Sequence, residues 1–344
     1  MKIEPLHQLR QVLLGAAVLA STLLGSATTQ AQINEHSFRL SAGDPEDAPG
    51  PTATRRFAEL VALRSGGKIE IKTFHSAILG SDVQMHGALA GGTMDFALVG
   101  APTLVGLVKE FGVLDFPFLY RDAPQVHAML DGPLGRKLLD RLGDKGLVGL
   151  GFWEIGFRNI TNSRGPITRW EDLQGLKIRT VQSPVFRAFF NALGANAVPL
   201  PINEVFTALE TRAIDAQENP VSIVAAQKFD EVQRYLSLTG HIYTAYALLA
   251  SKQTWDGLND EERSLIAQAA AEARDFQRAL AREQNAALLV ELEQRGMEIN
   301  EISAEERARF VDQAKPVIIK LTSDIGEAFV GEWMAELKTG RQLK

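Results

Sequence analysis

Two arginines and an asparagine stand at the ends of predicted strands, where an α/β protein holds its ligands. Arg158 lies in the run Gly-Phe-Arg-Asn at 156–159, Arg179 ends an apolar segment, and Asn219 directly precedes Pro220 at a predicted helix start. An arginine at the carboxyl end of an inner strand points toward the crevice of an open sheet. Its planar guanidinium can hold a carboxylate through two parallel hydrogen bonds, which lysine cannot do. A single arginine is more often a surface or salt-bridging residue, so the residues alone leave that alternative open.

Signatures of catalysis and of bound cofactors are absent from the sequence. It has no nucleophile-elbow serine, no phosphate-binding glycine loop and no strand-embedded dinucleotide fingerprint. Cysteine is also absent, which excludes disulfides, zinc–thiolate sites, iron–sulfur clusters and cysteine nucleophiles. The 6 histidines are scattered, and His75 and His86 lack metal-ligand spacing. We therefore expect no cofactor, no metal and no enzymatic activity.

Length and charge restrict the class of protein further. A chain of 344 residues is too long for one core and favours two lobes. With 45% hydrophobic and 23% charged residues, the composition is that of a globular protein. The net charge of −6 argues against a nucleic-acid partner, because a phosphate backbone requires a basic face.

The amino-terminal segment has the three parts of a secretory signal. Lys2 and Arg10 are followed by an apolar run at 12–24 and then by small residues. The apolar run is shorter than the ~20 residues that span a bilayer. We expect residues 1–31 to be a signal peptide cleaved after Ala31, with Ala27 as the other candidate. The mature chain would then be periplasmic, without a lipid anchor and without direct membrane insertion; the alternative is an uncleaved amphiphilic anchor.

The spacing of apolar residues predicts an α/β protein with two lobes. In the first lobe Phe38 and Leu40 alternate with polar neighbours as in a strand. A helix that ends near Gly66, a strand at 68–74, a helix at 82–89 and a strand at 94–99 follow. This β-α-β-α-β order predicts a largely parallel sheet. The same rhythm then repeats and predicts strands at 147–153, 176–180 and 197–200, an extended segment at 213–217, and helices near 186–193 and 205–209.

The chain is expected to cross between the lobes near 155–156 and to return near 239–244. Lobe 1 then comprises residues 32–155 with a return segment at about 245–285, and lobe 2 comprises residues 156–244 with a carboxyl-terminal segment at about 296–325. Residues 260–295 contain neither proline nor glycine and predict one helix, capped by Asn259 with Glu262. At ~1.5 Å per residue that helix would be about 50 Å long and would bridge both lobes. Ser303 and Glu306 predict a capping box for a further helix, which Pro316 could kink or divide.

A series of motifs, in order along nearly the whole mature chain, resembles one known family. The chain resembles the periplasmic solute-binding subunits of tripartite ATP-independent periplasmic (TRAP) transporters, in the DctP-like branch. The motifs include Ile-Leu-Gly-Ser-Asp at 78–82, Gly-Gly-Thr-Met-Asp-Phe at 91–96, Leu-Asp-Phe-Pro-Phe at 114–118, Gly-Phe-Arg-Asn-Ile-Thr-Asn at 156–162, Asp-Leu-Gln-Gly-Leu-Lys-Ile-Arg at 172–179, Glu-Val-Phe-Thr-Ala-Leu-Glu-Thr at 204–211 and Ile-Asp-Ala-Gln-Glu-Asn-Pro at 214–220.

The resemblance implies two α/β lobes, joined by crossing strands and a long helix, that close over an organic acid. In such proteins the residue corresponding to Arg179 clamps the ligand carboxylate, and those corresponding to Arg158 and Asn219 assist it. The bound solute would pass to membrane permease subunits driven by an ion gradient.

Two departures from the sialic-acid-binding members bear on the ligand. Those members carry an acidic residue where this chain has Gly100, and an aromatic ring where it has Ile202. A pocket with fewer polar partners leaves sugar hydroxyls unpaired at ~1–3 kcal/mol each. We therefore expect a C4-dicarboxylate, or a hydroxy- or oxo-acid with an apolar or aromatic tail. Trp153, His241 and Tyr243 are further candidates for the pocket wall, although Trp153 is equally a candidate core residue.

Three alternatives remain open at this point. The first is a sugar acid, either a uronate or an aldonate, bound by the same mechanism. The second is a secreted enzyme that captures an organic acid with Arg179 and uses His241 as a base. The third is a sensory protein that presents its bound solute to a membrane receptor.

Overall fold

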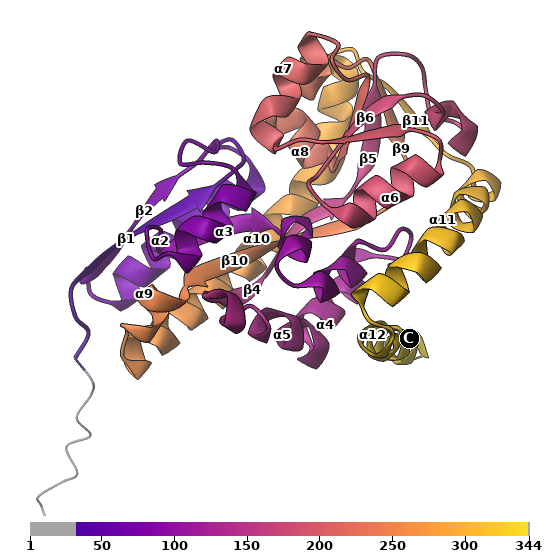
Figure 1. The fold of residues 1–344 in the computed structure, drawn as a ribbon. Coiled ribbons are helices and arrows are strands. Elements are labelled where there is room, and N and C mark those ends of the chain that lie inside the picture. The colour runs from indigo at the N-terminus through magenta and orange to yellow at the C-terminus, as the bar shows by residue number, and fades with distance from the viewer. Residues whose placement is uncertain (1–31, 343–344) are drawn as a thin grey trace, which may run out of the picture. The chain divides into compact units, whose positions relative to one another are not determined.

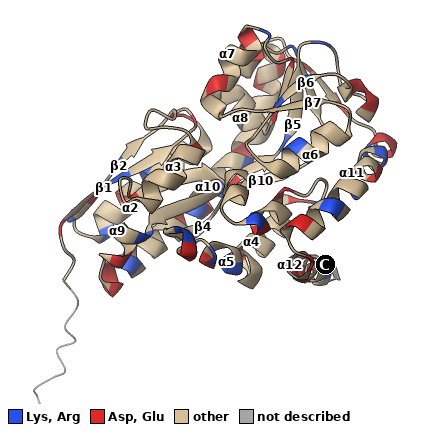
Figure 2. Cartoon of the chain, in the orientation of Figure 1, with Lys and Arg blue, Asp and Glu red and all other residues tan. Residues whose placement is uncertain are grey.

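Two β-sheets, each covered by helices, organise the chain. The computed structural model describes residues 32–342, so the predicted signal peptide at 1–31 lies outside the described residues. From Ile33 onward the chain forms one packed unit. We call the part built on the first sheet lobe 1 and the part built on the second sheet lobe 2 (Figure 1). Acidic and basic residues are intermixed along the helices of both lobes (Figure 2).

The lobe 1 sheet is mixed, in the order β2-β1-β3-β10-β4. β1 pairs in parallel with β2 and β3, as the local β-α-β order predicted, but β10 pairs antiparallel with both β3 and β4. The expectation of a largely parallel sheet is corrected here, because β10 returns from lobe 2 and inserts between β3 and β4. The strands are β1 His36–Ala42, β2 Ile69–Phe74, β3 Phe96–Gly100, β4 Leu147–Phe157 and β10 Tyr243–Ser251.

Helices cover both faces of this sheet and place its loops. The helix α3 begins after Ser81, whose side chain accepts a hydrogen bond from the Gln84 N–H while the Gln84 side chain accepts one from the Ser81 N–H. This reciprocal cap fixes the first turn of α3 beside the carboxyl end of β3. The helices of lobe 1 are α2 Pro49–Arg64, α3 Asp82–Ala90, α4 Ala123–Asp131, α5 Pro133–Asp140 and α9 Lys252–Asp256.

The lobe 2 sheet has the order β11-β9-β5-β8-β6-β7. β6 pairs in parallel with β7 and β8, so the carboxyl ends of β6 and β8 lie at the same edge. Arg179 and Asn219 both belong to those ends. The elements are β5 Asn159–Asn162, β6 Lys177–Thr180, β7 Asn196–Pro199, β8 Ala216–Asn219, β9 Tyr235–Leu238, β11 Glu298–Glu301, α6 Pro184–Ala192, α7 Val205–Glu210 and α8 Val221–Ala226.

Two polypeptide crossings and two long helices join the lobes. β4 ends at Phe157 and β5 begins at Asn159, so Arg158 lies on the first crossing; the second runs from the end of β9 to the start of β10. The helix α10, Asp260–Gln294, begins at the predicted Asn259 cap. Its amino-terminal half packs Ile266 and Ala273 in the lobe 1 core, and its carboxyl-terminal half packs Leu292 in the lobe 2 core (Figure 1).

The helix α11, Ala304–Ile325, is a second bridge on the other side of the sheets. It packs Phe310 in lobe 2 but Leu321 and Ile325 in lobe 1, so it differs from the expectation that this segment belongs to lobe 2 alone. Pro316 lies inside the helix without dividing it. A final helix, α12 Glu327–Gln342, was not predicted and packs its Trp333 in the lobe 1 core.

The predicted capping box at the start of α11 is only half formed. Ser303 accepts a hydrogen bond from the Glu306 N–H at 3.1 Å. The Glu306 carboxylate instead accepts the Trp170 N–H and pairs with Arg309. Tertiary partners therefore take the side chain that the local motif would use. No helix in the described part of the chain is both long and apolar enough to cross a membrane.

Candidate ligand-binding site

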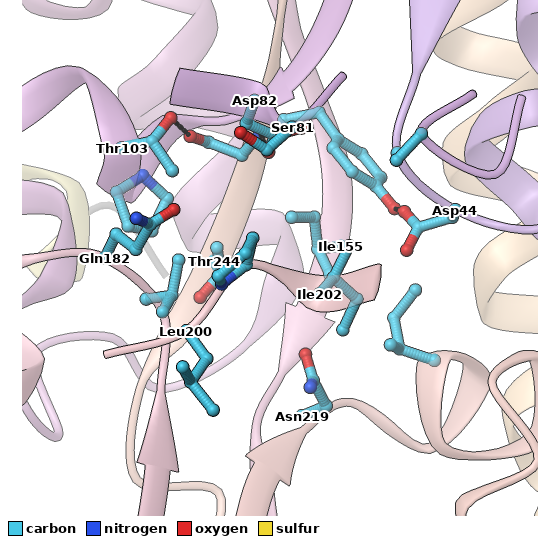
Figure 3. A pocket seen from close by; sticks show the side chains of 18 of the residues that line it. Asp44, Ser81, Asp82, Thr103, Ile155, Gln182, Leu200, Ile202, Asn219 and Thr244 are labelled. Atoms are coloured by element: carbon cyan, nitrogen blue, oxygen red, sulfur yellow. Dashed lines mark hydrogen bonds between the residues drawn. The ribbon is translucent and has the colours of Figure 1, made fainter. Parts of the chain in front are cut away.

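A cavity opens between the lobes, where the carboxyl ends of strands from both sheets meet. Its volume is ≈ 670 Å³ when the open mouth is included. Figure 3 shows Asp44, Ser81, Asp82 and Thr103 along one side and Leu200, Ile202 and Asn219 along the other. The remaining lining residues are Gly43, Ala77, Gly100, Pro102, Ile155, Arg158, Arg179, Val181, Gln182, Pro201, Ile223, Thr244 and Tyr246.

Arg158 lines the cavity, but its charge is already paired. Its Nε donates to Glu218 Oε2 at 2.5 Å, and its Nη2 donates to Glu218 Oε1 at 3.0 Å and to Asn219 Oδ1 at 2.8 Å. Burial alone would raise the pKa of Glu218, but the Arg158 guanidinium and the hydrogen bond with His241 outweigh it and lower that pKa. Glu218 is thus ionised and fully buried, and the ion pair fixes the Arg158 side chain in the cavity wall.

Arg179 is the cavity's unpaired cation. It lies in β6 and is 3% exposed. Its Nε and Nη2 donate to the Leu200 carbonyl at 2.9 and 2.6 Å, and among the described residues its guanidinium forms no ion pair. Burial lowers its pKa to about 10, so it stays cationic at neutral pH. Its Nη1 has no hydrogen bond to any described residue, which leaves donors for a ligand.

Asn219 is held beside the ion pair by its neighbours. Its Oδ1 accepts from Arg158, and its Nδ2 donates to Gln217 Oε1 at 2.7 Å. Because β8 ends at this residue, the amide lies at the sheet edge that faces the cavity (Figure 3). The structure therefore brings the predicted Arg158, Arg179 and Asn219 to one cavity.

Lobe 1 contributes two aspartates that the sequence analysis did not select. Asp44, in the loop after β1, is buried, and its carboxylate accepts hydrogen bonds from the Tyr246 hydroxyl and from Gln227 Nε2. Asp82, in the first turn of α3, is partly buried and accepts the Gly100 N–H at 2.8 Å. Burial raises the pKa of both, that of Asp82 to about 7. An acidic residue in a helix first turn is an ordinary feature, so only its position within the 78–82 motif could have marked Asp82.

Gly100 and Ile202 line the cavity on opposite sides, in lobe 1 and lobe 2 respectively. A Cβ at Gly100 would lie 3.3 Å from Asp82 Oδ2. The carboxylate of Asp82 therefore occupies the space beside Gly100.

Trp153, His241 and Tyr243 do not line the cavity. Trp153, which belongs to β4, is 1% exposed and packs in the lobe 1 core that also holds Ile266 of α10. Tyr243 is buried in a second hydrophobic core of lobe 1, which also holds Trp333. His241 lies behind the wall, with Nδ1 2.7 Å from Thr239 Oγ1 and Nε2 3.3 Å from Glu218 Oε2. Burial lowers the pKa of His241, and its contacts make it a support for Glu218 rather than a base that meets a ligand. No cluster of His, Asp or Glu in the described residues could hold a metal ion.

Comparison with known proteins identifies the family. The model for bacterial extracellular solute-binding protein, family 7 (DctP), matches residues 40–324. The crystal structure of the sugar acid binding protein DctPAm from Advenella mimigardefordensis strain DPN7T, in complex with galactonate, is 41% identical with a TM-score of 0.88, covering 89% of this chain and 99% of that one.

Two curated relatives show similar coverage. The 2,3-diketo-L-gulonate-binding periplasmic protein YiaO of Escherichia coli (strain K12) is 36% identical over 305 residues, 89% of this chain and 91% of the relative. The C4-dicarboxylate-binding periplasmic protein DctP of Rhodobacter capsulatus is 33% identical over 319 residues, 91% and 95% respectively. The predicted resemblance and two-lobe α/β fold are confirmed, and the relatives are transport proteins, not enzymes. The chain belongs to the family 7 (DctP) extracellular solute-binding proteins, which serve TRAP transporters and bind organic acids.

Proposed function

We propose that the chain captures a sugar acid, with the ligand carboxylate on Arg179 and the two lobes closed around it. The observation that carries this proposal is a buried guanidinium with no ion pair among the described residues, facing a cavity between two lobes. Arg158 cannot serve equally well because Glu218 already pairs with it. Arg158 and Asn219 instead shape the rim of the carboxylate site through their mutual hydrogen bond.

The polar groups of lobe 1 favour a hydroxylated acid over the less hydroxylated ligands expected from the sequence. Asp44, Asp82 and Thr103 supply oxygen atoms to the wall opposite Leu200 and Ile202. Each ligand hydroxyl that is buried needs such a partner. The relative with bound galactonate is more similar in sequence than the C4-dicarboxylate-binding relative, which agrees with this choice.

The periplasm and a membrane permease complete the proposal. The two curated relatives described above are named periplasmic binding proteins, which supports the same compartment for this chain. A binding protein of a TRAP transporter delivers its solute to membrane permease subunits, so the mouth of the cavity must become accessible to them when the lobes open. The enzyme alternative has no support in the site, because His241 is buried behind the wall.

Replacing the clamp tests the proposal. In Arg179→Ala, galactonate binding should weaken at least about a hundredfold, because leaving one charge of a buried pair alone costs ~3–5 kcal/mol. Arg179→Lys should also bind weakly, since an ammonium cannot reproduce the planar fork. Isothermal titration calorimetry gives the dissociation constants, and Arg187→Ala, an exposed arginine of the same lobe, is the control. Unchanged binding in Arg179→Ala would exclude Arg179 as the residue that binds the ligand carboxylate.

A further inference from the structure

We infer that Asp82 is a specificity-determining residue, which accepts hydrogen bonds from ligand hydroxyls and excludes acids that carry a second carboxylate. The inference rests on the proposed function and narrows its ligand class to polyhydroxylated monocarboxylates. It depends on how the Asp82 carboxylate is positioned and on the charges that surround it. It also depends on the Asp82 oxygen that accepts no hydrogen bond from any described residue.

Two glycines leave the space that the Asp82 carboxylate occupies. A Cβ at Gly43 would lie 3.1 Å from Asp82 Oδ1, and one at Gly100 would lie 3.3 Å from Asp82 Oδ2. Both distances are shorter than ordinary van der Waals contact, so a larger residue at either position would press on the carboxylate. The Ser81 cap fixes the start of α3, and the Gly100 N–H holds Oδ2 at 2.8 Å. The group is thus positioned by its own helix and by β3.

The two aspartates differ in the hydrogen bonds that they have already made. Asp44 accepts from Tyr246 through Oδ2 and from Gln227 through Oδ1. Asp82 uses only Oδ2, and its Oδ1 has no hydrogen-bond donor among the described residues. Asp82 Oδ1 is therefore the oxygen of these two carboxylates that no described donor occupies, and it can accept a hydrogen bond from a ligand on the lobe 1 side of the cavity.

The charges around the cavity discriminate between one carboxylate and two. Glu218 compensates Arg158, so Arg179 is the cation that remains, and Asp44 and Asp82 are the lining acids. A monocarboxylate neutralises Arg179 and presents hydroxyl donors to Asp82. A dicarboxylate of the same length brings a second anion to the acidic wall, where like charges in close contact weaken binding tenfold or more.

A pair of acids that differ at one end of the same carbon chain tests the inference. Galactonate ends in a hydroxymethyl group and galactarate ends in a second carboxylate. By calorimetry at pH 8, the wild-type protein should bind galactonate at least about tenfold more tightly than galactarate. In Asp82→Asn, the ratio of the two dissociation constants should fall at least about tenfold, because an amide keeps the Gly100 contact and offers an N–H to the second carboxylate. Asp144→Asn, an exposed aspartate of lobe 1, should keep the wild-type ratio.

The outcomes separate this inference from the proposed function. Equal affinity of the wild-type protein for the two acids, or an unchanged ratio in Asp82→Asn, overturns the role of Asp82 even if Arg179→Ala abolishes binding of both. Galactonate bound undiminished by Arg179→Ala overturns the clamp instead. If neither galactonate, gluconate nor their dicarboxylate counterparts bind the wild-type protein, both the proposed sugar-acid function and the inference fail.

Discussion

At position 82 the fold holds a carboxyl group where its ionised form is disfavoured. Burial raises the pKa of Asp82 to about 7; the Gly100 N–H opposes the shift, the nearby Asp44 carboxylate adds to it, and the Arg179 guanidinium opposes it. In the unfolded chain the same group ionises near its ordinary value of about 3.9. Between these two pH values the folded protein therefore holds a proton that the unfolded chain has released.

This difference predicts a specific pH dependence of stability. As the pH falls from about 7 toward 4, Asp82 should raise the free energy of unfolding by roughly 1 kcal/mol per pH unit. Urea unfolding of the ligand-free protein at pH 7.5, 6.5 and 5.5 should show the wild type gaining stability relative to Asp82→Asn, while Asp144→Asn follows the wild type. Parallel curves for the wild type and Asp82→Asn would show that Asp82 has an ordinary pKa.

The sequence pointed to the basic half of the site better than to its acidic half. Arg179 and Asn219 end neighbouring parallel strands, and that local pattern is enough to predict that they face a common edge. Asp82 is ordinary in its local context, since a helix first turn favours acidic residues for electrostatic reasons alone. Its role depends on contact with Gly100, and the ion pair of Arg158 with Glu218 joins the crossing after β4 to the strand β8. Neither contact follows from local spacing.

At the scale of elements, the helix α10 is fixed to the crossing strand β4 by one glutamine. Gln277 is fully buried; its Oε1 accepts the Glu154 N–H at 2.8 Å and its Nε2 donates to the Glu154 carbonyl at 2.6 Å. A side-chain amide thus pairs with a peptide group as a neighbouring strand would. Glu154 lies close to the point where β4 leaves lobe 1, so this contact anchors the bridge beside the crossing.

Removing that amide should destabilise the protein measurably. In Gln277→Ala, two buried peptide groups of Glu154 lose their partners at ~1–3 kcal/mol each, so we expect the free energy of unfolding to fall by about 2 kcal/mol or more. Chemical denaturation measures the change. Gln268→Ala, an exposed glutamine on the same helix, should change stability by less than about 0.5 kcal/mol. A small effect of Gln277→Ala would mean that water replaces the amide.

The sequence predicted whether a segment is a helix or a strand better than it predicted which elements pack or pair with each other. The α10 helix follows from a long stretch without proline or glycine, and its Asn259 cap from a local motif. The antiparallel insertion of β10 between β3 and β4 joins segments far apart in the sequence, and no local rule specifies it. The packing of α11 against both lobes could not be predicted either. An amphipathic pattern shows that one face of a helix is buried, but not which lobe covers it.

At the scale of the whole molecule, ligand capture depends on the lobes meeting across the cavity. Gln227 of lobe 2 donates to Asp44 of lobe 1. Ile202 of lobe 2 also approaches Gly43 of lobe 1, where a Cβ would lie 3.6 Å from Ile202 Cγ2. Gly43 therefore lies where the lobes come together. Hinge motions of this kind place the flexible residues in the crossing segments, and the ligand stabilises the closed arrangement.

A wedge at this meeting point should prevent closure. In Gly43→Leu, the added side chain meets Ile202, and overpacking costs of ~1–3 kcal/mol predict galactonate binding weakened about tenfold or more. Small-angle X-ray scattering at saturating galactonate should show the radius of gyration falling in the wild type and in Gly106→Leu, whose exposed glycine has open space around it, but not in Gly43→Leu. The scattering also separates two causes of weak binding. Contraction of saturated Gly43→Leu to the wild-type radius would mean that the side chain disturbs only Asp82, and the proposed closure at Gly43 would be wrong.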